Sequence, residues 1–357
     1  MALKLGILGI DHGHIFGMLS HMQQQGCTCD MYWTDGSAVT EEKFNQVFPQ
    51  VQKMQDRRRI LEDPAIHMIL ISAIPADRAA LAIEAMEAGK DVMVDKPGCT
   101  TLDQLAAIKA TQERTGRIWS VNFSERFEVR AVTKAAELVR RGDIGRVVQV
   151  VTLAPHKQNL KTRPRWYFER ERYGGILCDI GSHQVDQFLH FTGSTDVQIA
   201  HAHVENTTMP NEPGFQDYGE ITLMGDGGHG YLRLDWFTPD GLPTWGDGRL
   251  FILGTEGSLE VRKYTDIGQP HRTDNLYLVS RDHNTYIDCR DQPLPYFANL
   301  ISDVQHRSET AMTQAHFLNA LDSASDVSVL LGTSLRFFHV FRTGLPSTKL
   351  QRKWLNP

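Results

Sequence analysis

Short runs of hydrophobic residues alternate with amphipathic stretches over the first third of the chain. The hydrophobic runs predict strands at residues 3–9, 27–34, 66–74, 91–95 and 118–123. Helical spacing of apolar positions predicts helices between them, at 14–25, 79–88 and 102–111. A nearly continuous apolar run such as 66–74 is typical of a strand covered on both faces. Strands that alternate with helices in this way predict a doubly wound parallel sheet.

The pattern changes after residue 124. A helix predicted at 131–140 precedes a valine-rich strand at 146–154. Further strand-like runs follow one another through glycine or proline turns, at 197–204, 219–223, 230–237, 249–253, 258–262 and 276–279. Strands joined by short turns predict an antiparallel sheet. We therefore expect an α/β chain with two domains: a doubly wound domain at 1–124, and an α+β domain at 125–357 with a large, mainly antiparallel, open sheet.

Composition limits the kinds of partner. Hydrophobic residues make up 41% and charged residues 22% of the 357, as in a globular protein with a core. The formal net charge of −6 gives no electrostatic reason to bind nucleic acid or an anionic membrane. The basic run 57–59 stands beside Asp56 and Glu62, and we interpret it as a solvated face. We expect neither nucleic-acid binding nor membrane binding.

The cysteines and the N-terminal residues indicate the compartment. The five cysteines are odd in number and lack the spacing of a disulfide framework or a structural zinc site. The first residues have no signal-peptide pattern, and no apolar stretch approaches the roughly 20 residues that span a bilayer. We expect reduced thiols and a cytoplasmic protein.

The turn after the first predicted strand reads Gly9-Ile10-Asp11-His12-Gly13-His14. A dinucleotide needs a strand, a tight glycine turn and a helix whose N-terminus faces the pyrophosphate. Of the glycines in the G-x-G-x-x-G pattern only Gly9 is present; Asp11 and His14 occupy the other two positions. An ordinary strand–turn–helix fits this segment as well. His12 and His14 are alternatively metal ligands, but no completing set stands nearby, so we expect no metal.

Asp35 strengthens the nucleotide interpretation. It follows the second predicted strand, about twenty residues beyond the glycine turn, where an acidic side chain accepts hydrogen bonds from the adenosine ribose. Gly36 and Ser37 supply no arginine for a 2′-phosphate. The sequence thus favours NAD over NADP, with a simple turn aspartate as the alternative.

The segment Asp95-Lys96-Pro97-Gly98 stands at the carboxyl end of a predicted strand, where open α/β sheets bind ligands. Pro97 biases Lys96 toward extended backbone and allows a cis bond. A lysine ammonium aimed into such a crevice can polarise a hydroxyl or carbonyl oxygen. A surface turn is the alternative.

A second candidate centre lies in the glycine-bounded stretch 174–186. If it is helical, Asp179 and His183 lie four residues apart on one face. A histidine can take the proton of a substrate hydroxyl while hydride leaves the same carbon, and a carboxylate can orient its ring. An ordinary helix pair is the alternative.

Taken in this order, the motifs resemble the Gfo/Idh/MocA family of sugar and polyol dehydrogenases, which includes inositol dehydrogenase and glucose–fructose oxidoreductase. The resemblance spans most of the chain. It rests on residues 85–97, close to the family's EAGKHV…EKP, and on 121–127, 174–186 and 254–260.

The resemblance implies a Rossmann domain and an open sheet whose exposed face often makes homodimers or homotetramers. It implies that Lys96 contacts the reacting oxygen and the cofactor, that His183 is the acid/base, and that Asp179 is its partner and also touches substrate. Asp95 replaces the usual glutamate, and Arg78 stands where many relatives carry histidine, with no role assigned. The expected cofactor contacts are Gly9, Asp11, His12, Gly13, His14, Asp35, Ala73, Ile74, Asp95, Lys96, Pro97 and Asn122.

The polar and aromatic stretch 156–172 is the expected substrate wall. Its candidate residues are His156, Lys157, Arg163, Arg165, Trp166 and Tyr167. Polar groups and an aromatic face suit a hydroxyl-rich ring, and an arginine here leaves an acidic sugar open. The expected substrate contacts are Lys96, His156, Arg163, Trp166, Asp179 and His183.

The expected activity is NAD-dependent oxidation of a secondary alcohol on a sugar, sugar derivative or cyclitol. Two alternatives share the fold. One is a glycoside-cleaving enzyme that oxidises, eliminates and re-reduces with tightly held NAD. The other is a non-catalytic ligand sensor, which has no need of a lysine, aspartate and histidine together.

Overall fold

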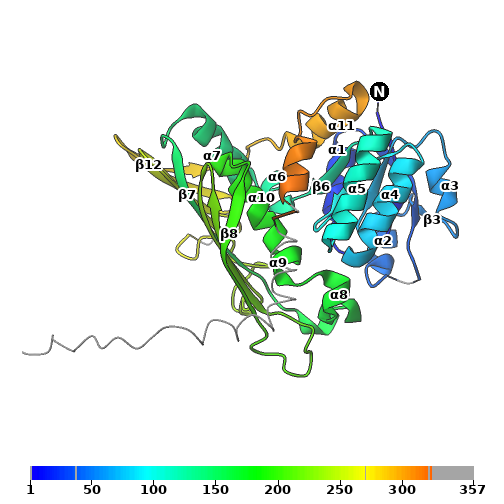
Figure 1. Cartoon of the computed structure of the whole chain (residues 1–357), viewed down its shortest axis with the longest axis horizontal. Helices are drawn as coiled ribbons and strands as arrows, with labels where there is room; N and C mark the ends of the chain where they lie inside the picture. Colours follow the sequence, from blue (N-terminus) through cyan, green and yellow to red (C-terminus); the bar gives the residue numbers. More distant parts are fainter. Residues whose placement is uncertain (1, 37, 270, 321, 324–357) are drawn as a thin grey trace, which may run out of the picture.

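The computed structural model describes residues 2–36, 38–269, 271–320 and 322–323. Within these residues the chain forms two sheets, each with helices packed against it (Figure 1). This is the predicted fold class: a doubly wound parallel sheet followed by a larger, mainly antiparallel one.

The first sheet has six strands in the order β3-β2-β1-β4-β5-β6, and every neighbouring pair is parallel. Its central strands are buried on both faces, which explains their continuous apolar runs. The strands are β1 (Lys4–Leu8), β2 (Thr28–Trp33), β3 (Gln52–Lys53), β4 (Met68–Ile71), β5 (Asp91–Asp95) and β6 (Trp119–Asn122). The helices are α1 (Ile15–Gln24), α2 (Glu41–Val47), α3 (Arg58–Leu61), η1 (Pro75–Asp77), α4 (Arg78–Glu87) and α5 (Leu102–Thr115).

The second sheet has eight strands in the order β14-β13-β12-β11-β7-β10-β9-β8. All its pairs are antiparallel except β7 with β10, which run parallel. The strands are β7 (Val147–Pro155), β8 (Val197–Glu205), β9 (Tyr218–Gly225), β10 (Gly228–Asp235), β11 (Arg249–Gly254), β12 (Gly257–Arg262), β13 (Asn275–Ser280) and β14 (Asn284–Asp288). The helices are α6 (Ser124–Phe127), α7 (Arg130–Arg141), η2 (Leu160–Thr162), η3 (Arg165–Phe168), α8 (Arg170–Tyr173), α9 (Ile176–Asp179), α10 (Gly181–Thr192) and α11 (Tyr296–His306).

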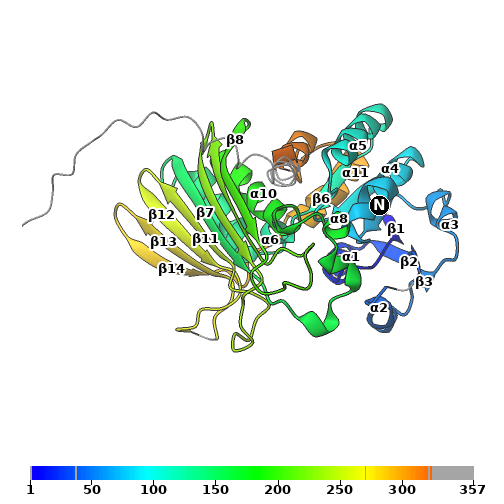
Figure 2. The same ribbon diagram turned by 60° about the horizontal axis from the view of Figure 1, so that its bottom comes forward.

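Helix α10 lies between the two sheets (Figures 1 and 2). It packs on β7 and β10, and its residues Gly181 to Leu189 are all buried. Gly181 lets the helix approach the sheet, since a Cβ there would lie 3.1 Å from Leu234. This packing holds His183 and the end of α9 above the carboxyl ends of the parallel strands.

After the second sheet the chain returns to the first. Helix α11 packs against α1, and the Tyr296 hydroxyl forms a hydrogen bond with Ser120 of β6. The Trp119 amide donates to the Gln314 side chain at 3.0 Å, and Arg307 forms an ion pair with the buried Asp91. Residues near the described end therefore cover the outer edge of the six-stranded sheet.

No helix in the described part of the chain is long and apolar enough to cross a bilayer. All five cysteines are free and buried.

Candidate active site

A cavity of about 530 Å³ lies where the two halves of the chain meet. The first half contributes the loop before α1 and Lys96; the second contributes α10 and the segment after β7. The cavity lining includes ten residues expected from the sequence: Asp11, His12, Gly13, His14, Lys96, His156, Arg163, Trp166, Tyr167 and His183.

Lys96 and Asp179 form a buried ion pair, although 83 residues separate them. The Lys96 ammonium donates to Asp179 Oδ1 at 2.9 Å. Burial acts to lower the pKa of Lys96, but the Asp179 carboxylate, with smaller effects from Tyr167 and Asp95, raises the pKa on balance. Burial likewise acts to raise the pKa of Asp179, and Lys96 reverses this, so that the pKa falls below its usual value. Both groups are therefore charged at neutral pH.

His183 faces the same cavity but is not bonded to Asp179. Its ring is 2% exposed, and its Nδ1 has no hydrogen-bond partner among the described residues. Burial, reinforced by the positive charge of Lys96, holds the pKa of His183 well below its usual range. The ring is thus neutral at pH 7, with a nitrogen lone pair able to accept a proton. Asp179, expected from the sequence to orient His183, binds Lys96 instead.

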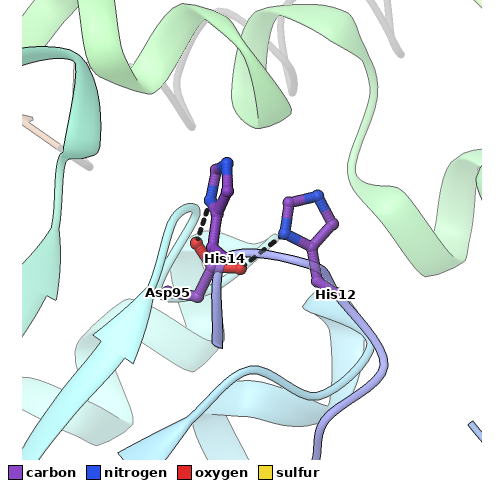
Figure 3. A group of neighbouring side chains, drawn as sticks. All are labelled: His12, His14 and Asp95. Carbon is purple, nitrogen blue, oxygen red and sulfur yellow. Dashed lines mark hydrogen bonds and ion pairs between the residues drawn. The ribbon is translucent and has the colours of Figure 1, made fainter. Parts of the chain in front are cut away.

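The Asp95 carboxylate contacts both histidines of the loop before α1. His14 Nδ1 lies 2.8 Å from Asp95 Oδ1, and His12 Nδ1 lies 2.8 Å from Oδ2. Figure 3 shows both rings next to this one carboxylate, each with its other ring nitrogen turned away from it. Because the carboxylate is an acceptor, a neutral ring carries its hydrogen on Nδ1 and leaves Nε2 as an acceptor. Burial lowers the pKa of His12 to about 4, despite the opposing Asp95 charge.

Arg78 holds the Asp95 carboxylate in place. Its guanidinium is fully buried and donates to Asp95 Oδ2 at 3.0 Å. It also donates to the backbone carbonyls of Ala73, Asp95, Lys96 and Pro97. Burial acts to raise the pKa of Asp95, but Arg78 and the two histidines hold it well below its usual range. The residue without an assigned role in the sequence thus organises the Asp95-Lys96-Pro97 turn, whose Lys96–Pro97 bond is cis.

The loop that carries the altered glycine pattern is closely packed at one end and open at the other. Gly9 has φ +80°, and a Cβ there would lie 2.4 Å from the Ala73 Cβ, so no other residue fits. Gly13 is exposed, and a Cβ there would meet nothing within 4 Å. The loop therefore leaves free space before the first turn of α1, which fits a pyrophosphate. Burial raises the pKa of Asp11 to about 6.

The other expected cofactor contacts lie outside the cavity lining. Asp35 is exposed just beyond β2, and Ile74 is half-buried before η1. Asn122 is buried at the end of β6, and its side-chain amide donates to Glu128 at 2.9 Å. Lys53 donates to the Gly36 carbonyl at 3.0 Å and pairs with Glu41, so a basic side chain beside Asp35 already has an acidic partner.

The expected substrate wall divides into two groups. His156, Arg163, Trp166 and Tyr167 line the cavity, and burial lowers the pKa of His156 to about 4. Lys157 and Arg165 do not line it. Lys157 donates to the Leu242 carbonyl, and Arg165 is exposed and pairs with Glu212 at 2.7 Å.

The cavity also contains residues that the sequence analysis missed: Glu125, Trp236, Trp245, Lys263 and Tyr264. Glu125 and Lys263 form a second buried ion pair across 138 residues. Several of these residues follow directly on a strand, as Trp236 follows β10 and Lys263 follows β12. Position at a strand end was thus a usable signal.

His12, His14 and Asp95 are also close enough to hold a metal ion, with one ligand atom from each within 4.8 Å of the others. However, Asp95 already receives hydrogen bonds from Arg78 and Ser72. The Asp95 carboxylate is thus already engaged by Arg78, Ser72 and the His14 ring.

Family models match both halves of the chain. The model of the oxidoreductase family with an NAD-binding Rossmann fold matches residues 27–123, and that of the GFO/IDH/MocA C-terminal domain matches 132–260. The chain belongs to the Gfo/Idh/MocA family. It is therefore an oxidoreductase with a nucleotide-binding Rossmann domain, as the sequence motifs predicted.

Individual members of the Gfo/Idh/MocA family are similar over most of the chain. A crystal structure of a candidate oxidoreductase from Erwinia carotovora atroseptica is 38% identical, with a TM-score of 0.89, and the match covers 92% of this chain and 98% of that one. The scyllo-inositol 2-dehydrogenase (NAD(+)) of Bacillus subtilis is 26% identical over 82% of this chain and 80% of its own length. The NADP(+)-dependent scyllo-inositol 2-dehydrogenase IolW of the same organism is 23% identical, and the match spans 63% of each chain, just under two thirds.

Proposed function

We propose that the protein oxidises a secondary alcohol of a sugar, sugar derivative or cyclitol, with NAD as the redox partner. The observation that carries the proposal is that Lys96, held by its ion pair with Asp179, faces one cavity together with the neutral His183. A charged donor and an unprotonated base beside one space can act on the same hydroxyl group. The named activities of the two Bacillus subtilis relatives support this substrate class.

Residues 9–14, Asp35 and the Asp95-Lys96-Pro97 turn would hold the nucleotide, with Ala73, Ile74 and Asn122 nearby. The open space at Gly13 suits the pyrophosphate, and the exposed Asp35 suits the adenosine ribose. Near this end of β2, Lys53 pairs with Glu41, and Arg57, which lies over Trp33, pairs with Glu84. This supports NAD over NADP, since a 2′-phosphate needs an uncompensated cation. When bound, NAD supplies the hydride acceptor.

The chain's own residues provide the proton chemistry. His183 is neutral and takes the proton of the reacting hydroxyl. Lys96 stays charged because Asp179 pairs with it, and its ammonium stabilises the alkoxide that forms. Asp179 thereby sets the charge and position of Lys96. His156, Arg163 and Trp166 contact the remainder of the substrate.

A screen of sugars, cyclitols and sugar acids, followed by NADH absorbance, tests the proposal. We expect at least one compound to reduce NAD, and Lys96→Ala and His183→Ala to lower kcat by about 10²–10⁴-fold with that compound. Normal turnover in either variant would rule out these roles. Release of a leaving group without NADH accumulation would instead identify glycoside cleavage. Cofactor binding with no turnover of any compound would favour a sensor.

The open face of the second sheet is a proposed homodimer or homotetramer interface. Met224, Leu253 and Val279 are each about half exposed, at 46%, 48% and 52%. They belong to one continuous row of cross-strand neighbours, Met224–His229–Gln149–Leu253–Ser258–Val279, so they share a face. Light scattering of the Leu253→Lys/Val279→Lys variant, compared with the wild type, tests this: the variant should dissociate.

The free cysteines support the proposal of a cytoplasmic location.

A further inference from the structure

Arg163 is held in an aromatic cage on the wall of the cavity. Its guanidinium carbon lies 4.0 Å from the ring centroid of Tyr167, 4.5 Å from that of Trp236 and 5.0 Å from that of Trp245. The three rings come from separate segments: η3, the residue after β10, and the loop before β11. Cation–π contacts of this kind stabilise the guanidinium and fix its plane, but they supply no negative charge.

The hydrogen bonds of Arg163 leave part of its guanidinium free. Nε donates to the Gln158 carbonyl at 2.9 Å, and Nη2 donates to the Lys157 carbonyl at 3.2 Å. Both acceptors are neutral. A guanidinium has five N–H donors. The Nη1 hydrogens and the second Nη2 hydrogen, which form the end of the fork, have no partner in the described chain.

The other basic residues of the cavity are already neutralised. Lys96 pairs with Asp179, and Lys263 pairs with Glu125. Among the described lysines and arginines that line the cavity, Arg163 is the one without an acidic partner. The neighbouring Arg165, which the sequence left as an equal candidate, is exposed and bound to Glu212. The cavity thus has one uncompensated positive charge, at a fixed position.

A second unsatisfied donor lies beside Arg163. The Trp236 side chain is 4% exposed and lines the cavity, and its indole N–H has no partner among the described residues. Buried donors in folded proteins are almost always paired.

We propose that the substrate carries a carboxylate, which Arg163 binds through the free end of its guanidinium; this inference rests on the proposed function. The planar fork matches a carboxylate in a bidentate arrangement. One uncompensated cation matches the single negative charge of a carboxylate, since the other cavity lysines, Lys96 and Lys263, are already paired with acids. Arg163, Lys96 and Tyr167 all line the same cavity, so one substrate can contact the free guanidinium and the Lys96 ammonium together. That arrangement fits a sugar acid, such as a hexuronic acid.

Matched pairs of neutral and acidic sugars test the inference. Glucose with glucuronate and galactose with galacturonate give pairs that differ in one carboxylate. We expect kcat/KM for the acid to exceed that for its neutral partner by about tenfold or more, because only the acid pairs with Arg163. Arg163→Met, which keeps the length of the stem inside the cage, should lower kcat/KM for the acid by about 30–100-fold, and that loss should exceed the loss for the neutral sugar by about tenfold or more. Arg165→Met should change neither.

The outcomes separate this inference from the proposed function. If kcat/KM for the neutral sugars equals that for the acids, or if Arg163→Met lowers both equally, the carboxylate site is wrong. The proposed dehydrogenase activity is then still supported. If no sugar reduces NAD, calorimetric titration of the NADH-loaded protein with glucuronate still decides: binding to the wild type and not to Arg163→Met supports the site, and equal or absent binding overturns it. A loss of NAD affinity in Arg163→Met would assign the arginine to a cofactor phosphate instead. If Arg163→Met does not fold, Arg163→Lys replaces it, since it keeps the charge but loses the fork and should still weaken binding of the acid.

Discussion

Lys96 and Asp179 form a 2.9 Å ion pair in which neither side chain is more than 6% exposed. The pair joins the turn after β5 to the end of α9, so it also joins the two halves of the chain. Breaking a buried pair by removing one partner leaves an uncompensated charge. Removing one partner should therefore change both the catalytic rate and the pH dependence of that rate.

Asp179→Asn should shift the pH profile of the enzyme. Without the Asp179 carboxylate, burial of Lys96 is opposed only by the weaker effects of Tyr167 and Asp95, so the pKa of Lys96 falls. Lys96 then loses its proton at a lower pH, so the alkaline decline of kcat/KM should begin at lower pH than in the wild type. At neutral pH we expect kcat to fall by about 10–100-fold. Asp179→Glu restores the charge and should recover part of the alkaline range. An unchanged alkaline limb in Asp179→Asn would contradict this role.

Arg78→Met should destabilise the fold rather than act on chemistry alone. The substitution leaves Asp95 buried without its main cation and removes donors from four backbone carbonyls. We expect a loss of about 3–5 kcal/mol in the free energy of unfolding. Urea denaturation measures it. The double variant Arg78→Met/Asp95→Asn should lose less than the sum of the single variants, because it leaves no unpaired charge; strict additivity would speak against the coupling.

Asp11→Asn should strengthen NAD binding in a pH-dependent way. The pKa of Asp11 is raised to about 6 by burial, so the wild-type side chain is charged at pH 8 and largely protonated at pH 5. A carboxylate next to the pyrophosphate repels it, and an amide does not. Calorimetry should show NAD binding about 3–10-fold tighter in Asp11→Asn at pH 8, and equal affinities at pH 5. Equal affinities at both pH values would place Asp11 away from the phosphates.

Metal removal should leave the activity intact. The His12, His14 and Asp95 cluster is close enough for an ion, but Arg78 and Ser72 already occupy Asp95. Dialysis against EDTA should change kcat by less than about twofold, and added zinc should not activate the protein. Loss of activity on chelation, with recovery on adding zinc, would assign a metal to this cluster.

The fold was predictable where local pattern and burial agree. Strand β5 occupies 91–95, as expected, because its five residues are buried and Gly89 and Pro97 bound it. Helix α5 begins as expected at Leu102, and the Thr101 side chain caps it by accepting from the Gln104 amide. The parallel pairing of β7 with β10 was not predictable from short turns, since five helices, two of them 3₁₀ helices, and two strands intervene between them.

The individual residues of the site were predictable from the sequence, but the contacts between their side chains were not. Lys96, Asp179 and His183 all face one region because each stands at a strand end or on a buried helix. Their pairing was not predictable. Asp179 is four residues from His183, and a helical pattern favours that contact, yet it binds a lysine 83 positions away. The sequence did not predict the Glu125–Lys263 ion pair for the same reason, since tertiary packing alone brings the two residues together.

The return of α11 to the first sheet has a consequence for how the chain can be divided. Strand β6 is an outer strand, and the Trp119 amide on it is paired by Gln314, while Tyr296 binds the neighbouring Ser120. An unpaired outer strand is a template for joining other chains and for aggregation. A fragment that contains only the first 124 residues would keep all six strands of its sheet but lose this protection. The nucleotide-binding half is thus a complete sheet whose solubility depends on residues encoded almost two hundred positions later.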